Sequence, residues 1–163
     1  MNIHIPTYRI GLLMPFNDFF AQSQTALFGK QVINDIHKIL ESEDINIRTR
    51  RVTPVRWNTR SGNYMLERVH KSNSLIIDIS YNEPTMYYSF GIISLAAQFN
   101  KWDMNIFLIQ NEDLSEQVNL PSFLESYKDE VIKYRFKDND FSIATENRYS
   151  EMIESIADEL FEL

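Results

Sequence analysis

A single carboxylate, Asp78, interrupts the apolar run of residues 74–79. Side chains able to form hydrogen bonds follow it at Ser80, Asn82 and Glu83, just before a proline that opens a helical pattern. A helix start offers unpaired backbone N–H groups and a partial positive charge, which suit anionic groups and sugar hydroxyls. We therefore expect a small-molecule site here, with Asp78 and Glu83 as the candidate catalytic carboxylates.

The same residue types also have structural uses, and both interpretations stay open at this point. Asp, Asn and Ser often complete turns by bonding to their own backbone. Glu and Pro are both favoured where a helix begins, because the first N–H groups lack partners and carry partial positive charge. The pattern at residues 78–84 therefore fits a ligand site and a capped turn equally well in chemical terms.

Cationic charge is concentrated in a second segment. Between residues 48 and 68 one acid, Glu67, stands against six arginines: Arg48, Arg50, Arg51, Arg56, Arg60 and Arg68. In one interpretation this Arg-rich loop binds an anion or phosphate, and the guanidinium groups of Arg51 and Arg56 make bidentate contacts to it. In the other it is a solvated loop whose arginines pair with the acidic C-terminal helix.

Composition excludes several kinds of chemistry. The chain has no cysteine, so it has no disulfide, iron–sulfur cluster, thiolate zinc site or cysteine nucleophile. The three histidines, at positions 4, 37 and 70, are isolated from one another and from acids at ligand spacing. We expect no metal site and no cofactor.

Length and charge favour one small domain spanning residues 1–163. A hydrophobic content of 44% with 24% charged residues is typical of a globular protein. No apolar run is long enough for a membrane helix, so we expect a cytoplasmic protein without a membrane partner. The net charge of −7, concentrated in residues 102–163, makes nucleic acid an unlikely partner.

The elements that must position these residues alternate between strands and helices. Short apolar or alternating runs predict strands, and apolar residues spaced three and four apart predict helices. The strands are expected at residues 8–13, 45–49, 74–79, 104–109 and 131–136, and the helices at 25–40, 62–72, 86–100 and 146–163. This order predicts a three-layer α/β fold with a mainly parallel, five-stranded sheet, flavodoxin- or Rossmann-like.

Two motifs resemble those of a known family. The first predicted strand ends in Met14-Pro15-Phe16, and the third continues through Asp78-Ile79-Ser80 into Asn-Glu-Pro-Thr-Met-Tyr-Tyr-Ser-Phe-Gly-Ile at residues 82–92. With a further match around residues 120–134, nearly the whole chain resembles the nucleoside 2-deoxyribosyltransferase-like family, a relative of TIR-type NAD hydrolase domains. The resemblance implies a homo-oligomer and a nucleotide- or nucleoside-like ligand, held by Met14, Pro15, Phe16, Arg51, Ser80, Asn82, Tyr88, Ser89 and Gly91.

The chain departs from this family at the residue that carries its chemistry. In active members a Glu attacks or stabilises the anomeric carbon, and the aligned residue is Ser89. A neutral serine cannot stabilise an oxocarbenium-like transition state, and no serine triad is visible. We expect a binding domain, a pseudoenzyme weak or inactive in glycosidic cleavage. The alternatives are an active N-glycosidase or deoxyribosyltransferase using Asp78 or Glu83, and a protein-interaction or oligomerisation domain.

Overall fold

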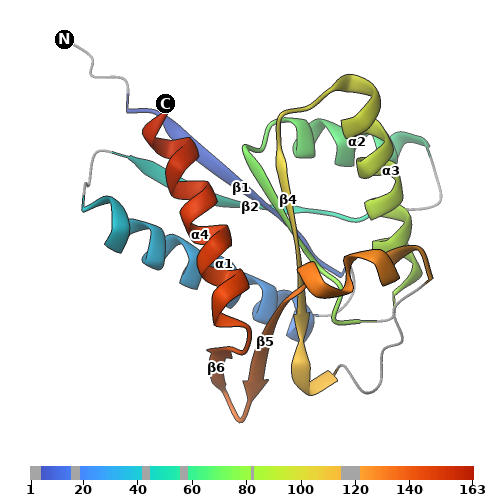
Figure 1. The fold of residues 1–163 in the computed structure, drawn as a ribbon. Helices are drawn as coiled ribbons and strands as arrows, with labels where there is room; N and C mark the ends of the chain where they lie inside the picture. The colour runs from blue at the N-terminus through green and yellow to red at the C-terminus, as the bar shows by residue number, and fades with distance from the viewer. Residues whose placement is uncertain (1–4, 16–18, 42–44, 56–58, 82, 115–121) are drawn as a thin grey trace.

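A computed structural model of the chain contains one six-stranded sheet with helices on both faces (Figure 1). It describes residues 5–15, 19–41, 45–55, 59–81, 83–114 and 122–163. The strands are β1 (Thr7–Leu13), β2 (Asn46–Val52), β3 (Ser74–Asp78), β4 (Asn105–Asn111), β5 (Ile132–Lys137) and β6 (Asp140–Ile143). The helices are α1 (Phe19–Leu40), α2 (Thr59–His70), α3 (Pro84–Asn100) and α4 (Glu146–Phe161), with 3₁₀ helices η1 (Glu112–Leu114) and η2 (Ser122–Glu130) between β4 and β5.

The sheet order is β2-β1-β3-β4-β5-β6, and the first five strands are parallel. Order 2-1-3-4-5 is that of flavodoxin-like doubly wound sheets, so the predicted α/β class and mainly parallel sheet are confirmed. The predicted count of five strands is wrong, because β6 pairs antiparallel with β5. Asp138 and Asn139 form the two-residue turn between these strands with φ of 52° and 62°, the conformation that hairpin turns require.

Two cores lie on opposite faces of the sheet because neighbouring side chains of a strand point to opposite sides. Ile10 and Leu12 of β1 belong to the core that packs against α1 and α4. Leu13 and Val52 belong to the core that packs against α2 and α3. Figure 1 shows the two helix pairs on either side of the strands, which gives the three layers that alternation predicted. Among the described helices, none is both long and apolar enough to cross a membrane.

One glycine sets the distance between α1 and the sheet. A Cβ built at Gly29 would lie 2.9 Å from Leu12 Cδ1 and 3.1 Å from Thr49 Cγ2, closer than packed carbon atoms approach. The helix therefore sits against β1 and β2 where a larger residue would push it away. This close packing places Thr25, near the start of α1, within hydrogen-bond distance of Asp78 at the carboxyl end of β3.

Two of the predicted element boundaries differ from those in the structure. Helix α1 begins at Phe19, six residues before the start predicted from its apolar spacing. Strand β2 continues to Val52, so Arg50 and Arg51 lie in the same edge strand as Arg48 rather than in a loop. The prediction of an Arg-rich loop is therefore wrong for Arg50 and Arg51, while Arg56 lies outside the described residues.

Candidate functional site

The sheet changes direction of growth between β1 and β3, the point at which ligands bind in doubly wound folds. Leu13 pairs in register with Ile77. Met14, directly after β1, and Asp78, the last residue of β3, therefore lie beside each other at the same edge of the sheet. Met14 is buried in the core on the α1 face. The buried Pro15 offers its carbonyl to Gln22 Nε2 at 2.8 Å. Met14 and Pro15, both predicted site residues, are therefore buried and packed beneath this edge of the sheet.

Asp78 is fully buried and surrounded by hydrogen-bond donors. Its Oδ2 lies 2.7 Å from the Tyr134 hydroxyl and 2.8 Å from Thr25 Oγ1. Its Oδ1 accepts from the Ser80 backbone N–H at 3.0 Å and from the Ser80 hydroxyl. These partners come from α1, β5 and the turn after β3, so the carboxyl group ties three elements together.

The hydrogen-bond network continues from Asp78 into β4 and back to α1. The backbone N–H of Asn111 donates to Ser80 Oγ at 2.6 Å, and the Asn111 side chain donates to Gln24 Oε1 at 3.1 Å. Gln24 Oε1 also accepts from the Tyr81 hydroxyl at 3.0 Å. A buried polar network whose members are all bonded specifies one arrangement of its elements. We call this set of seven residues the Asp78 network: Gln24, Thr25, Asp78, Ser80, Tyr81, Asn111 and Tyr134.

Burial raises the pKa of Asp78 even though Ser80, Tyr134 and Thr25 donate hydrogen bonds to it. The geometry around Thr25 agrees with a neutral acid, because Thr25 Oγ1 also lies 3.1 Å from the Ala21 carbonyl. One hydroxyl hydrogen can make a well-aligned bond to only one of these two acceptors. If Asp78 is protonated, it donates to Thr25, and Thr25 donates to Ala21. Burial also raises the pKa of Tyr134, which keeps its hydroxyl protonated.

Ser89, the residue that the motif resemblance places at the position of a catalytic Glu, is buried in α3. Its hydroxyl donates to the Thr85 carbonyl at 2.6 Å and accepts from the Val55 backbone N–H at 2.7 Å. The single hydroxyl hydrogen is therefore bound to a backbone carbonyl rather than to a base that could activate the oxygen. The bond from Val55 thus holds the segment after β2 against α3.

The remaining predicted residues lie on the first half of α3. Glu83 immediately precedes the helix, half-buried, and its Oε1 accepts from the Thr85 hydroxyl at 2.8 Å. Tyr87 packs in the core, whereas Tyr88 is 55% exposed. A Cβ built at Gly91 would meet no atom within 4 Å, apart from the helix's own backbone. Glu83 and the first turns of α3 thus offer a carboxylate, an aromatic ring and open surface in succession.

The structure separates Arg51 from these α3 residues. Val52 points into the core under α2 and α3, so Arg51, its neighbour along β2, points to the other face of the sheet. Arg51 is exposed there on the edge strand. Within the described ranges, no ion pair joins the arginines of β2 or α2 to α4, whose Arg148 pairs with its own Glu151 at 3.0 Å. The predicted pairing with the acidic C-terminal helix is therefore not present among these residues.

Five members of the Asp78 network were not predicted from the sequence: Gln24, Thr25, Tyr81, Asn111 and Tyr134. Each stands inside or beside an apolar pattern, where nothing nearby in sequence indicates a partner. Two predicted contacts, Phe16 and Asn82, lie outside the described residues. In the part of the chain that the structure describes, no three His, Asp or Glu side chains gather as metal ligands would.

Comparison with protein-family models and with curated proteins finds no match to this chain. Its likeness to nucleoside 2-deoxyribosyltransferase-like proteins therefore rests on the two motifs and on the C-terminal segment named above. Any function must be argued from the side chains themselves.

Proposed function

We propose that this chain binds a nucleotide- or nucleoside-derived small molecule beside the start of α3 and does not cleave its glycosidic bond efficiently. The observation that carries the proposal is the hydrogen bonding of Ser89, whose hydroxyl donates to Thr85 and accepts from Val55. Glycosidic cleavage needs a carboxylate at the anomeric carbon, and the position that the resemblance gives to it holds a neutral, fully bonded group.

Binding is supported by what surrounds the first turns of α3. This helix starts at the carboxyl end of β3, beside the point where the strand order reverses. Backbone N–H groups at a helix start suit a phosphate. Glu83 can accept hydrogen bonds from ribose hydroxyls, and the exposed ring of Tyr88 offers a face on which a base can stack.

The alternative of an active N-glycosidase depends on a substitute carboxylate. Asp78 has no exposed surface through which to reach a substrate. Glu83 is partly exposed and lies directly before α3, so it is the carboxylate on which this alternative rests. Activity that depends on Glu83 would distinguish an enzyme from the binding domain proposed here.

The stacking role of Tyr88 is testable with a matched aromatic control. We expect NAD, ADP, dAMP or adenosine to raise the melting temperature of the unaltered chain by ~2–4 °C. Tyr88→Ala should lose this shift because stacking on a base contributes on the order of tenfold in affinity. Tyr64→Ala, which removes a 49% exposed tyrosine from α2, should keep it.

Thermal denaturation of the three proteins with each compound is the measurement. A shift that persists in Tyr88→Ala would remove the ligand site from this part of α3. A flat response of the unaltered chain to every compound would contradict the proposed ligand class.

One further observation favours self-association as a second function. None of the 17 residues of α3 is charged, and beyond Tyr88 the helix exposes Leu95 and Phe99, the latter by 81%. Isolated exposed apolar residues are common, but a helix without a charged residue on any side is unusual for one that solvent surrounds. We propose that α3 packs against a second copy of the chain in a homo-oligomer.

Charge introduced on α3 should break this association. We expect Phe99→Asp to sediment as a monomer and Phe161→Asp, which alters an exposed phenylalanine on α4, to sediment as the unaltered chain does. Sedimentation velocity at low and high salt makes the comparison. An uncharged interface should not weaken with salt, whereas a contact through the arginines of β2 should. A monomeric unaltered chain would contradict the interface.

A further inference from the structure

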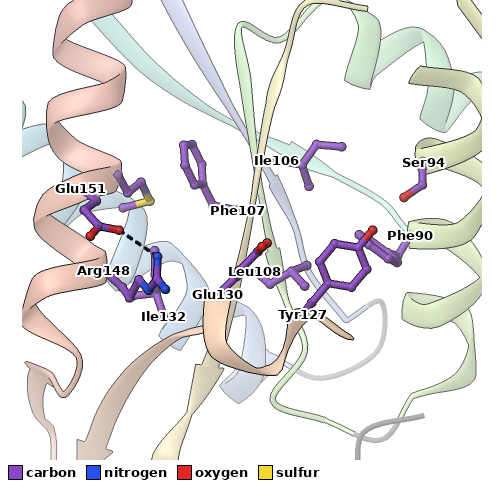
Figure 2. Close-up of a pocket in the computed structure, with 11 residues that line it drawn as sticks. Phe90, Ser94, Ile106, Phe107, Leu108, Tyr127, Glu130, Ile132, Arg148 and Glu151 are labelled. Atoms are coloured by element: carbon purple, nitrogen blue, oxygen red, sulfur yellow. Dashed lines mark hydrogen bonds and ion pairs between the residues drawn. The ribbon is translucent and has the colours of Figure 1, made fainter. Parts of the chain in front are cut away.

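A cleft of about 320 Å³ lies beside β4, on a part of the sheet separate from the candidate ligand site (Figure 2). Its floor is apolar and includes Ile106, Phe107 and Leu108 of this strand. Strand β5 first pairs with β4 at Ile109, opposite Ile132. Among the described residues, no strand therefore covers residues 105–108 on that side, and β4 has a free edge in the middle of the sheet order.

The unpaired backbone groups of this edge can be identified from the neighbouring strand. The Ile109 carbonyl accepts from the Ile79 N–H at 2.9 Å, on the β3 side. Because successive residues of a strand direct their N–H and C=O groups to opposite sides, those of Ile106 point away from β3. The N–H of Leu108 does the same. These three groups face the cleft and match the hydrogen-bonding pattern of one more strand.

The two walls of the cleft differ in character. Figure 2 shows Phe90 and Ser94 of α3 with Tyr127 of η2 on one side of β4, and these residues carry no charge. Arg148 and Glu151 of α4 lie on the other side, joined by a contact of 3.0 Å. An extended segment laid along β4 would place alternate side chains against each wall. The α3 wall suits apolar side chains, and the α4 wall suits charged ones.

Acidic groups outnumber basic ones around the charged side. Glu130, at the end of η2, lines the cleft in addition to the Arg148–Glu151 pair. Two carboxylates thus stand against one guanidinium among the residues that line the cleft, which favours a positively charged occupant.

We propose that the free edge of β4 binds an extended peptide in which basic and apolar residues alternate, added as a further strand between β4 and the two flanking helices. Strand addition of this kind takes its affinity from main-chain bonds and its specificity from alternate side chains. A second copy fits less well, because the surface is concave and a symmetric pair would place one cleft against another. The peptide site is independent of the nucleotide site proposed at α3.

The first test uses the unaltered full-length chain and a synthetic octapeptide of four Lys-Val repeats. Amide hydrogen exchange measured by nuclear magnetic resonance should slow at Ile106 and Leu108 when the peptide is added. The amide of Phe107, which faces β3, should not change. An octapeptide of four Glu-Val repeats should produce no protection, and four Lys-Pro repeats, which lack every second N–H, should bind weakly.

Substitutions on β4 test the backbone contact directly. Ile106→Pro removes one N–H from the free edge and leaves the bonds toward β3, which suits the places where proline occurs in sheets. We expect it to weaken binding of the Lys-Val octapeptide about fivefold to tenfold, as the loss of one main-chain hydrogen bond would. Ile106→Val keeps the N–H and should bind within about twofold of the unaltered chain. Glu151→Gln should weaken binding and reduce its salt dependence.

Three results would overturn the peptide site. The first is an octapeptide that fails to bind or that binds without protecting Ile106 and Leu108. The second is equal binding of the acidic and basic peptides. The third is protection of these two amides at high protein concentration without peptide, which would assign the edge to a second copy. The amide readout on the unaltered chain decides the matter even if Ile106→Pro does not fold.

Discussion

Asp78→Ala is expected to lower the free energy of unfolding by roughly 3–5 kcal/mol, because it leaves buried hydroxyl groups without their acceptor and opens a cavity. Tyr134, Thr25 and Ser80 all bond to this carboxyl group in the interior. For a chain of 163 residues this loss corresponds to a melting temperature lower by ~10 °C. Urea denaturation followed by circular dichroism measures the effect.

The matched variant Asp78→Asn should be far milder, because an amide keeps one acceptor oxygen for Ser80 and gives Thr25 a donor. The pH dependence then distinguishes the two residues. The folded-state pKa of Asp78 is raised above its ordinary value of 3.8, so the folded chain holds the proton more tightly than the unfolded chain. The contribution of Asp78 to stability is complete below about pH 4 and is lost as pH rises through the raised pKa.

Stability measured between pH 4 and 8 should therefore fall for the unaltered chain relative to Asp78→Asn. The difference in free energy of unfolding between the two proteins is the informative quantity. Asp35, whose pKa is lowered, makes the fold more stable as pH rises, and it does so in both proteins. If Asp78→Asn is as unstable as Asp78→Ala, or if the difference does not change with pH, Asp78 is ionised in the folded chain and the account of the network is wrong.

Phe28→Ala is the other substitution with a large expected effect, a loss of about 3–5 kcal/mol. Phe28 is fully buried, and its ring centroid lies 5.7 Å from that of Tyr134 and 5.9 Å from that of Tyr149. The centroid of the Phe28 ring also lies 6.2 Å from that of Phe141 in β6. Removing the ring therefore opens a cavity shared by α1, β5, β6 and α4. Phe28 stands one turn beyond Thr25 on α1, which links this aromatic cluster to the Asp78 network.

Phe28→Leu provides the size control and should cost about 1–2 kcal/mol, because leucine fills most of the volume. The same urea titration compares both variants with the unaltered chain. Equal stability of Phe28→Ala and Phe28→Leu would mean that the site collapses around the smaller residue. That result would contradict the tightly packed contact between α1 and the β5–β6 hairpin.

Strongly periodic segments made much of the fold predictable from sequence. The apolar run at residues 74–79, in which Asp78 is the only charge, predicts a strand covered on both faces, and β3 is indeed a fully buried inner strand. Alternation at residues 45–49 predicts an edge strand, and β2 is one. The alternation ends where Arg50 and Arg51 begin, although the strand does not, because an edge strand tolerates charged side chains that an inner strand would exclude.

Other features depend on contacts that sequence patterns do not reveal. The four-residue strand β6 is short and polar, and it exists because the turn at Asp138 and Asn139 folds it back onto β5. Tyr134 fits the alternation of a strand, so nothing in the sequence shows that its hydroxyl meets Asp78. Ser89 could be recognised as a departure from the motif, but its bond to Val55 depends on how α3 packs beside the end of β2.

Equilibrium dialysis with mass spectrometry tests binding without cleavage most directly. The chain on one side of a membrane is equilibrated with a mixture of NAD, nucleosides, deoxynucleosides and their phosphates, and each compound and each free base is quantified on both sides. We expect at least one intact compound to be enriched on the protein side and no free base to accumulate. Release of a base by the unaltered chain and not by Glu83→Gln would contradict this expectation and identify an enzyme.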